Sequence, residues 1–322
     1  MTEAPHTPFP VSEIPASRSA RLRPGTVVDR ARGCLLGLAV GDAIGTTVEF
    51  SPRGSFEPLT DMVGGGPFGL EAGQWTDDTS MALSLADSLL ASTAFDPTNL
   101  MQNFVGWFRD GEYSATGKCF DIGHTTETAL RLFEQSGEPF AGSRDPGDAG
   151  NGSLMRLAPV AIWGASRDDD LMRETARLQS ATTHGATTCL DACEAYAVMM
   201  KSVILGANFP AALLLASDIP LGDTIGQIIG GSFHRKPIQD IQSSGYVAHS
   251  LEAALWCVDS GGDFADMVLR AANLGDDADT TAAITGQLAG ALFGETGIPE
   301  DWLEKLAWRG IIGDMAEALL HR

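Results

Sequence analysis

The chain has 322 residues, of which 44% are hydrophobic and 20% charged, and this composition is typical of a folded globular protein. Asp and Glu number 42 against 21 Lys and Arg, so the formal net charge is -21. A surface this acidic repels the phosphates of nucleic acids and of anionic lipids, which argues against general nucleic-acid binding and against a membrane-surface role.

The N-terminal segment, residues 1–25, is rich in Pro, Ser, Thr and Arg and lacks a sustained hydrophobic period, which predicts a disordered tail. It also lacks the basic-then-apolar order of a secretory signal, and no apolar run approaches the roughly 20 residues that span a bilayer. The five cysteines are scattered without a CxxC pair, as expected of reduced thiols. We therefore expect a cytoplasmic protein without a membrane anchor.

The first predicted helix covers residues 27–40, an apolar stretch with helical spacing whose small residues would let a second helix approach closely. We expect it to end at Gly41-Asp42. A glycine-rich loop follows over residues 51–74, and Thr76 is a candidate N-cap for a helix over residues 80–90. Further helices are predicted over residues 99–108, 125–136, 154–163, 171–178, 187–205, 247–258, 263–272, 280–293 and 301–320.

The predicted fold class is all-α, a compact helical bundle with long functional loops. Most of the helical segments are rich in Ala and Leu, and alternating runs of Val, Ile, Thr and aromatic residues are almost absent. Residues 26–322 contain no interior linker, so we expect them to form a single domain. No heptad pattern or long exposed apolar seam is present, which favours a monomer.

Two acidic clusters stand out against the helical background, Thr76-Asp77-Asp78 and the segment from Gly275 to Thr280, and each lies at a predicted helix start. A single Asp there is explained by capping and by the helix dipole, a contribution of about 0.3 to 1 kcal/mol. A helix start needs only one cap, whereas each cluster supplies two or three carboxylates, which repel one another unless cations offset them. If the two helix starts meet, they form an all-oxygen site suited to hard divalent cations.

These segments belong to a larger set of motifs that resembles, in order, the ADP-ribosylglycohydrolase family over about residues 28–295. Two further segments, Cys119–Gly123 and Gly286–Gly290, resemble its bacterial branch, which includes the dinitrogenase-reductase-activating glycohydrolases. The motifs are Gly37–Gly45, Gly73–Thr79, Gly150–Arg156, Thr183-His184 and Gly275–Ala283.

The resemblance implies an orthogonal all-helical domain with a binuclear Mg²⁺ or Mn²⁺ centre that positions the distal ribose of ADP-ribose. The implied reaction is cleavage of the glycosidic bond between ADP-ribose and a modified target, with ADP-ribose as product. Asp276 occupies a position often held by Gly in the family, and we expect it to be solvated or to lie behind the ligands. The implied metal ligands are Thr76, Asp77, Asp78, Asp277, Asp279 and Thr280.

Two carboxylates are candidates for the catalytic acid or base that moves the proton. Glu49 matches a family glutamate near the metals, and Asp121 matches an aspartate that faces the scissile ribose in the bacterial branch. The resemblance does not decide between them. Taken alone, Glu49 would be interpreted as a solvated loop charge.

Substrate contacts are expected from three loops. Asn151, Gly152 and Ser153 precede a predicted helix, so their backbone N–H groups are candidates to bind the diphosphate; a plain turn and N-cap is the competing interpretation. In the family a histidine at the position of His184 approaches the substrate, and Tyr246 is a candidate to stack on adenine.

The acceptor is left open by the sequence. Arginine is favoured by family branch, and serine, a nucleobase or a small molecule are alternatives; His124 departs from the bacterial pattern in a way that bears on target choice. The expected partner is an ADP-ribosylated protein. Two other functions stay open: a metal-dependent phosphatase, and a non-catalytic ADP-ribose binder or structural protein like the lens crystallins of this fold.

Overall fold

The computed structural model describes residues 22–322, so most of the predicted tail, residues 1–21, lies outside the described residues. The described part of the chain contains fourteen α-helices joined by loops and short 3₁₀ turns, and its only β-pairing consists of isolated bridges. The all-α prediction is therefore confirmed. Within the same residues no helix has both the length and the hydropathy that crossing a membrane would require.

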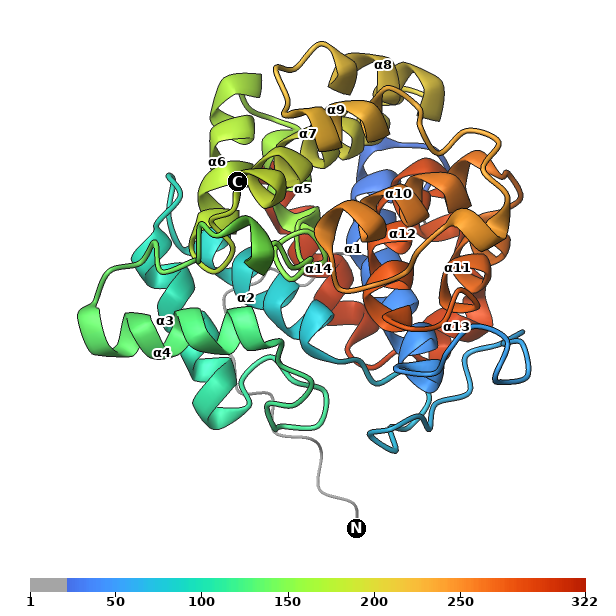
Figure 1. The fold of residues 1–322 in the computed structure, drawn as a ribbon, viewed down its shortest axis with the longest axis horizontal. Helices are drawn as coiled ribbons and strands as arrows, with labels where there is room; N and C mark the ends of the chain where they lie inside the picture. The colour runs from blue at the N-terminus through green and yellow to red at the C-terminus, as the bar shows by residue number, and fades with distance from the viewer. Residues whose placement is uncertain (1–21) are drawn as a thin grey trace.

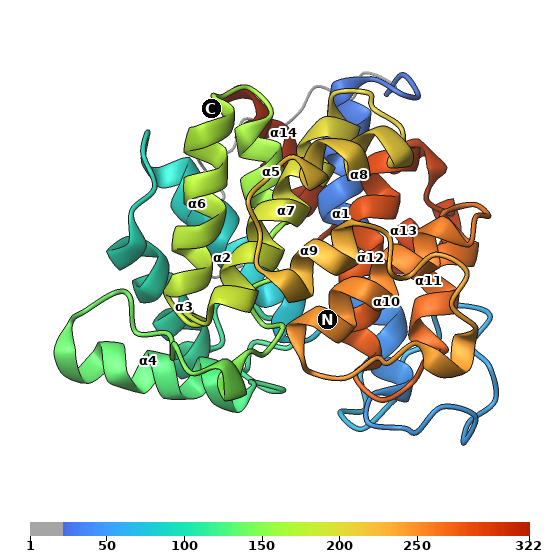
Figure 2. The ribbon, with the colours of Figure 1, turned by 45° about the horizontal axis from the view of Figure 1, so that its top comes forward.

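The helices form two groups on either side of a central pair, α1 and α12 (Figure 1). In Figure 1, α2, α3, α4 and α6 lie to the left of the pair, α10 and α11 pack against α12 on the other side, and α8 and α9 lie above; Figure 2 shows the same helices from a second direction. The bounds are α1 Val27–Gly45, α2 Asp77–Ala91, α3 Pro97–Asp110, α4 His124–Ser136, α5 Ala158–Gly164, α6 Asp169–Ala181, α7 Thr187–Ile204, α8 Phe209–Ser217, α9 Asp223–Ile229, α10 Val247–Asp259, α11 Phe264–Ala272, α12 Ala278–Phe293, α13 Glu300–Lys305 and α14 Arg309–His321.

Three of the predicted helices differ most from the observed ones. The first helix runs past Gly41-Asp42 to Gly45, because its glycines pack against another helix and this contact outweighs their poor helix propensity. The segment 301–320 divides into α13 and α14 at Trp308, which has a left-handed backbone (φ 53°) and packs edge-on against Trp75. The helix expected from residue 154 begins only at Ala158. Two helices, α8 and α9, were not predicted.

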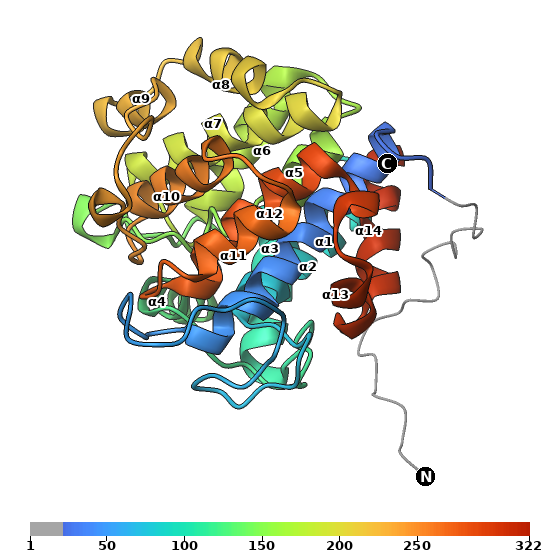
Figure 3. The ribbon, with the colours of Figure 1, turned by 90° about the vertical axis from the view of Figure 1, so that its right-hand side faces the viewer.

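The close contact between α1 and α12 organises the fold, and Figure 3 shows the two helices side by side. At one-turn intervals, small residues of the two helices meet so closely that a Cβ added to any of the α1 glycines would collide with α12 backbone. The order of the pairs shows that the helices run antiparallel. The pairs are Gly33 with Gly290, Gly37 with Gly286, Gly41 with Ala282, and Gly45 with Ala278.

The antiparallel contact places the C-terminal end of α1 beside the N-terminal end of α12. The start of α2 is tied to the same place, because Asp42 of α1 accepts hydrogen bonds from its first turn. The helix starts that carry the two acidic clusters therefore converge at one end of the central pair.

Replacing Gly37 with Val should lower the free energy of unfolding by about 3 kcal/mol, because the added side chain forces the two backbones apart. The control is Gly310→Ala: Gly310 lies in α14 with open space around it, so the change should raise stability by roughly 0.5 kcal/mol. Urea unfolding followed by circular dichroism measures both. Equal stability of wild type and Gly37→Val would contradict the close contact.

Candidate metal centre and active-site cavity

The first turn of α2 is held by a carboxylate from α1. Thr76 is the N-cap residue as predicted, but its hydroxyl makes no cap to its own helix and donates to Asp42 Oδ1 at 2.9 Å, as does its backbone N–H. The other oxygen, Asp42 Oδ2, accepts from the backbone N–H of Thr79 at 3.0 Å and from its hydroxyl at 2.6 Å. Asp42 thus accepts four hydrogen bonds and fixes the helix start without using Asp77 or Asp78.

The first turn of α12 is held in a similar way by Glu49, which follows α1 after a 3₁₀ turn, η2 (Thr46–Val48). Glu49 Oε2 accepts from the backbone N–H groups of Ala278 at 2.7 Å and Asp279 at 3.1 Å. Glu49 is only 5% exposed, so it is not a solvated loop charge. It caps α12 from outside the helix and faces the acidic cluster.

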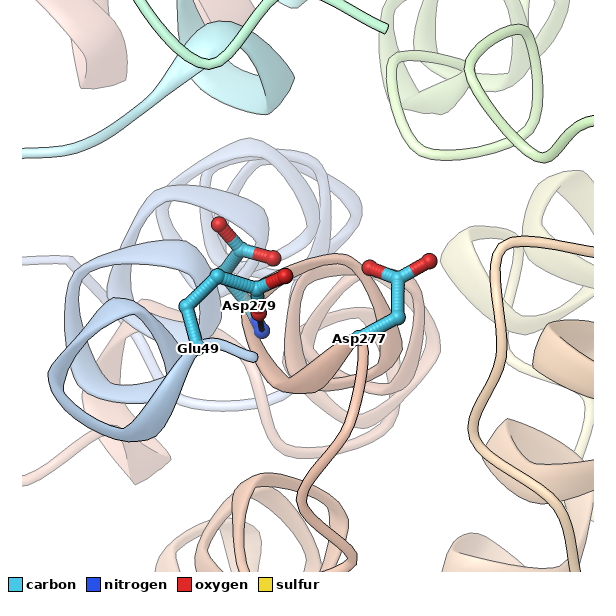
Figure 4. Close-up of side chains that lie close together, drawn as sticks. All are labelled: Glu49, Asp277 and Asp279. Atoms are coloured by element: carbon cyan, nitrogen blue, oxygen red, sulfur yellow. Dashed lines mark hydrogen bonds between the residues drawn. The ribbon is translucent and has the colours of Figure 1, made fainter. Parts of the chain in front are cut away.

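The two helix starts lie against each other. The Thr76 hydroxyl is 3.3 Å from Asp279 Oδ2, and the Thr280 hydroxyl is 3.4 Å from Asp78 Oδ2. Ligand oxygens of Glu49, Asp277 and Asp279 lie within 4.8 Å of one another. Figure 4 shows the Glu49 and Asp279 side chains close together, with Asp277 beside them. The sequence-predicted ligands of α2 and α12 are therefore neighbours in space.

The cluster has an excess of buried negative charge. Within residues 22–322, none of its carboxylates forms an ion pair with Lys or Arg. Burial, and next the charge of Asp279, raise the pKa of Asp42 and Asp277 to about 7 and that of Glu49 to about 12. The same burial, followed by neighbouring carboxylates, raises the pKa of Asp77 and Asp78.

Asp78 Oδ1 is buried and has no hydrogen-bond partner, although buried carboxylate oxygens are normally satisfied. Its other oxygen, Oδ2, lies 3.4 Å from the hydroxyls of Thr76 and Thr280, so the cluster offers carboxylates and threonine hydroxyls as ligands. Hard divalent cations such as Mg²⁺ and Mn²⁺ prefer such ligands, and a bound cation would replace the missing positive charge. The donor set and its electrostatics therefore fit divalent cations.

A cavity of about 770 Å³ opens above this cluster, a size within the range of small-molecule sites. Asp77, Asp277, Asp279, Thr280 and Glu49 form part of its wall. Thr76 and Asp78 are fully buried beneath them. Asp121, whose backbone is left-handed (φ 60°), also lines the cavity; burial and then the charge of Asp77 raise its pKa to about 11.

The loop expected to bind diphosphate has a different conformation from the prediction. Residues 151–156 form consecutive turns, and α5 begins only at Ala158, so Asn151, Gly152 and Ser153 do not sit at a helix N-terminus. Asn151 and Gly152 line the cavity, and the Asn151 side-chain amide donates to Asp277 Oδ2 at 2.8 Å. The Ser153 side chain is buried in the core instead, where it meets the Ser180 hydroxyl.

His184 lines the cavity from beneath this loop. Its imidazole packs so tightly under Gly152 that a Cβ there would lie 2.8 Å from the ring, and its Nδ1 shares a hydrogen bond with the Thr183 hydroxyl at 2.8 Å. Burial, and next the charge of Arg156, lower the pKa of His184 to about 3. His184 is therefore a neutral side chain that supports the loop and faces the cavity.

Tyr246 does not line the cavity; its ring packs edge-on against His249. Asp276 is exposed at the cavity rim, as expected. Asp42 was not predicted as a site residue, although it lies in the motif Gly37–Gly45. A buried Asp inside an apolar, glycine-rich helix was the available signal, because such a carboxylate needs several hydrogen-bond donors.

Comparison with known proteins identifies the same family as the sequence motifs. A family model described as ADP-ribosylglycohydrolase matches residues 23–322. The chain is 45% identical to the ADP-ribosylarginine hydrolase Tri1 of Pseudomonas putida (strain GB-1) over 320 residues, 99% of this chain and 85% of the relative. It is 34% identical to the ADP-ribosyl-(dinitrogen reductase) glycohydrolase of Rhodospirillum rubrum, covering 87% and 91% of the two chains.

A solved structure described as an ADP-ribosylglycohydrolase-related protein complex superposes with a TM-score of 0.81 at 40% identity. The match covers 92% of this chain and 98% of that one. The resemblance inferred from separated motifs therefore extends over the whole described fold.

Asp279→Asn should stabilise the cation-free protein, because the charge of Asp279 acts on every other carboxylate of the cluster. Mg²⁺ at 100 times its Kd should stabilise the wild type by about 2.7 kcal/mol and leave the variant unchanged. Thermal unfolding in EDTA and in Mg²⁺ measures this, with the exposed Asp218→Asn as control. Equal Mg²⁺ stabilisation of wild type and Asp279→Asn would exclude a cation at this cluster.

Asp42→Asn should weaken Mg²⁺ binding by about 10- to 100-fold although Asp42 does not line the cavity, because the amide can accept only part of the four hydrogen bonds. Asp29→Asn is the matched control, since Asp29 is equally buried at the opposite end of α1 and accepts from Thr296. Calorimetric titration with Mg²⁺ separates them. If both variants lose the same affinity, Asp42 has no specific role in the site.

Proposed function

The chain belongs to the ADP-ribosylglycohydrolase family, and from this premise we propose that it is a metal-dependent hydrolase that releases ADP-ribose from arginine side chains of modified proteins. The observation that most supports this function is the cluster of carboxylates without cationic partners that forms part of the wall of the cavity. The arginine linkage is supported by two relatives named ADP-ribosylarginine hydrolase, at 45% and 44% identity.

Two Mg²⁺ or Mn²⁺ ions are proposed as cofactors, because the two helix starts supply ligands in two sets. Bound cations would fix the ribose hydroxyls and stabilise charge as the glycosidic bond breaks. Glu49 joins the proposed set because its carboxylate lies among those of α12. The remaining proposed ligands are Thr76, Asp77, Asp78, Asp277, Asp279 and Thr280.

Asp121 is the better candidate of the two for the catalytic acid or base. Glu49 Oε2 is committed to two backbone N–H groups of α12, and its carboxylate is grouped with Asp277 and Asp279. Asp121 comes from a loop before α4, outside both ligand-bearing helices, and faces the cavity. These observations support Asp121 as the proposed group that gives a proton to the leaving nitrogen or takes one from the attacking water.

The rest of the substrate is assigned to the loops that line the cavity. Asn151 and Gly152 offer an amide side chain and close backbone approach, and His184 supports them from below. Stacking of adenine on Tyr246 remains a prediction that requires its ring to leave His249. We further propose that the protein acts as a monomer in the cytoplasm.

A phosphatase is disfavoured by the charges around the cavity. Phosphoryl transfer needs cationic side chains on the transferred group, and no Lys or Arg of residues 22–322 lines the cavity. Arg156, the basic residue of the motif Gly150–Arg156, is fully buried against Gln179.

Hydrolysis of an arginine-ADP-ribosylated protein should require Mg²⁺ or Mn²⁺ and cease in EDTA, and Asp121→Asn should lower kcat by about 10²- to 10⁴-fold with little change in ADP-ribose affinity. Released ADP-ribose and calorimetric binding measure these two quantities, and Asp218→Asn serves as the charge-matched control. A serine-ADP-ribosylated protein should react poorly. Binding of ADP-ribose without turnover of either substrate would identify a binder and refute the hydrolase.

A further inference from the structure

Phe50 is an exposed aromatic residue at the rim of the cavity, next to Glu49 in the chain. It is 64% exposed and its backbone is left-handed, with φ 62°. A bulky residue in this conformation costs on the order of 1 kcal/mol or more, which Gly or Asn would largely avoid. Its ring makes one edge-on contact, to Phe68 at 6.2 Å, and buries little surface in return. Packing alone therefore does not explain a phenylalanine here.

The same rim contains a second residue with a left-handed backbone, Asp276, with φ 56°. The two are joined directly: the Phe50 N–H donates to the Asp276 carbonyl, and the Asp276 N–H donates to the Ser51 carbonyl, both at 2.8 Å. This pair of backbone bonds holds the residue with the aromatic ring next to the residue with the carboxylate. Both residues line the cavity.

The Asp276 carboxylate is exposed and makes no hydrogen bond or ion pair with any residue from 22 to 322. Unlike Asp277 and Asp279, it lies outside the buried cluster. Glu49, which precedes Phe50, is bonded to α12 and not to Asp276. Asp276 thus presents a solvated negative charge to whatever enters the mouth of the cavity.

We propose that Phe50 and Asp276 together bind the guanidinium group of the arginine to which ADP-ribose is attached, and so determine acceptor specificity. The inference rests on the proposed function. A guanidinium is a planar cation that stacks on aromatic faces and donates paired hydrogen bonds to carboxylates. A primary ammonium or a hydroxyl makes both kinds of contact less well. With the ribose at the carboxylate cluster, the acceptor extends toward the rim.

The test uses Phe50→Asn and Asp276→Asn, because Asn tolerates the left-handed backbone and each change removes only the ring or the charge. Phe140→Asn and Asp218→Asn are the matched controls, an exposed Phe and an exposed Asp outside the cavity. Steady-state kinetics on ADP-ribosyl-arginine and on ADP-ribosyl-serine, and calorimetric Kd values for ADP-ribose, are measured for all five proteins.

Each rim variant should lower kcat/KM for ADP-ribosyl-arginine by about tenfold and leave both the reaction of ADP-ribosyl-serine and the Kd of ADP-ribose unchanged. The controls should match the wild type. Unchanged kcat/KM in both rim variants, or an equal loss of ADP-ribose affinity, would overturn the rim proposal while the proposed function stands. No turnover of ADP-ribosyl-arginine by the wild type would overturn both.

Discussion

The contact between α1 and α12 is the constraint on which the rest of the structure depends. Small residues one turn apart on each helix allow an approach at which a Cβ added to any α1 glycine would meet the α12 backbone in the observed register. That register places the end of α1 beside the start of α12. Asp42, just before this end, holds the start of α2, and Glu49, just after it, holds the start of α12. One helix end thereby positions both ligand-bearing turns.

This arrangement separates capping from ligand binding. Helix starts are usually capped by their own N-cap side chain, but here the caps of α2 and α12 come from outside both helices. The carboxylates of Asp77, Asp78, Asp277 and Asp279 are consequently available to other partners. Their mutual repulsion and burial destabilise the cation-free protein, a common cost of a functional site. The same separation leaves Asp121, from another loop, as the proton-transferring group of the proposal.

The sequence was sufficient to predict the helical fold, because Ala- and Leu-rich segments and the absence of strand patterns are local properties. It also identified both acidic clusters, since repeated carboxylates at a helix start exceed what capping requires. Their meeting was implied only by the family resemblance, and the role of Asp42 was not predicted, because both depend on the register between α1 and α12. The start of α5 and the burial of Ser153 were missed for the same reason: turns at residues 151–156 are set by contacts with distant segments such as Gly245. Nothing in the local pattern indicated that Phe50 and Asp276 would be adjacent.

The most direct test of the account is a crystal structure of the protein grown with Mn²⁺, with an anomalous difference map recorded at the manganese edge. The account predicts two peaks between the first turns of α2 and α12, coordinated by oxygens of Asp77, Asp78, Asp277 and Asp279. An absence of peaks there in crystals that bind Mn²⁺ elsewhere would contradict the claim that these two helix starts form the metal centre.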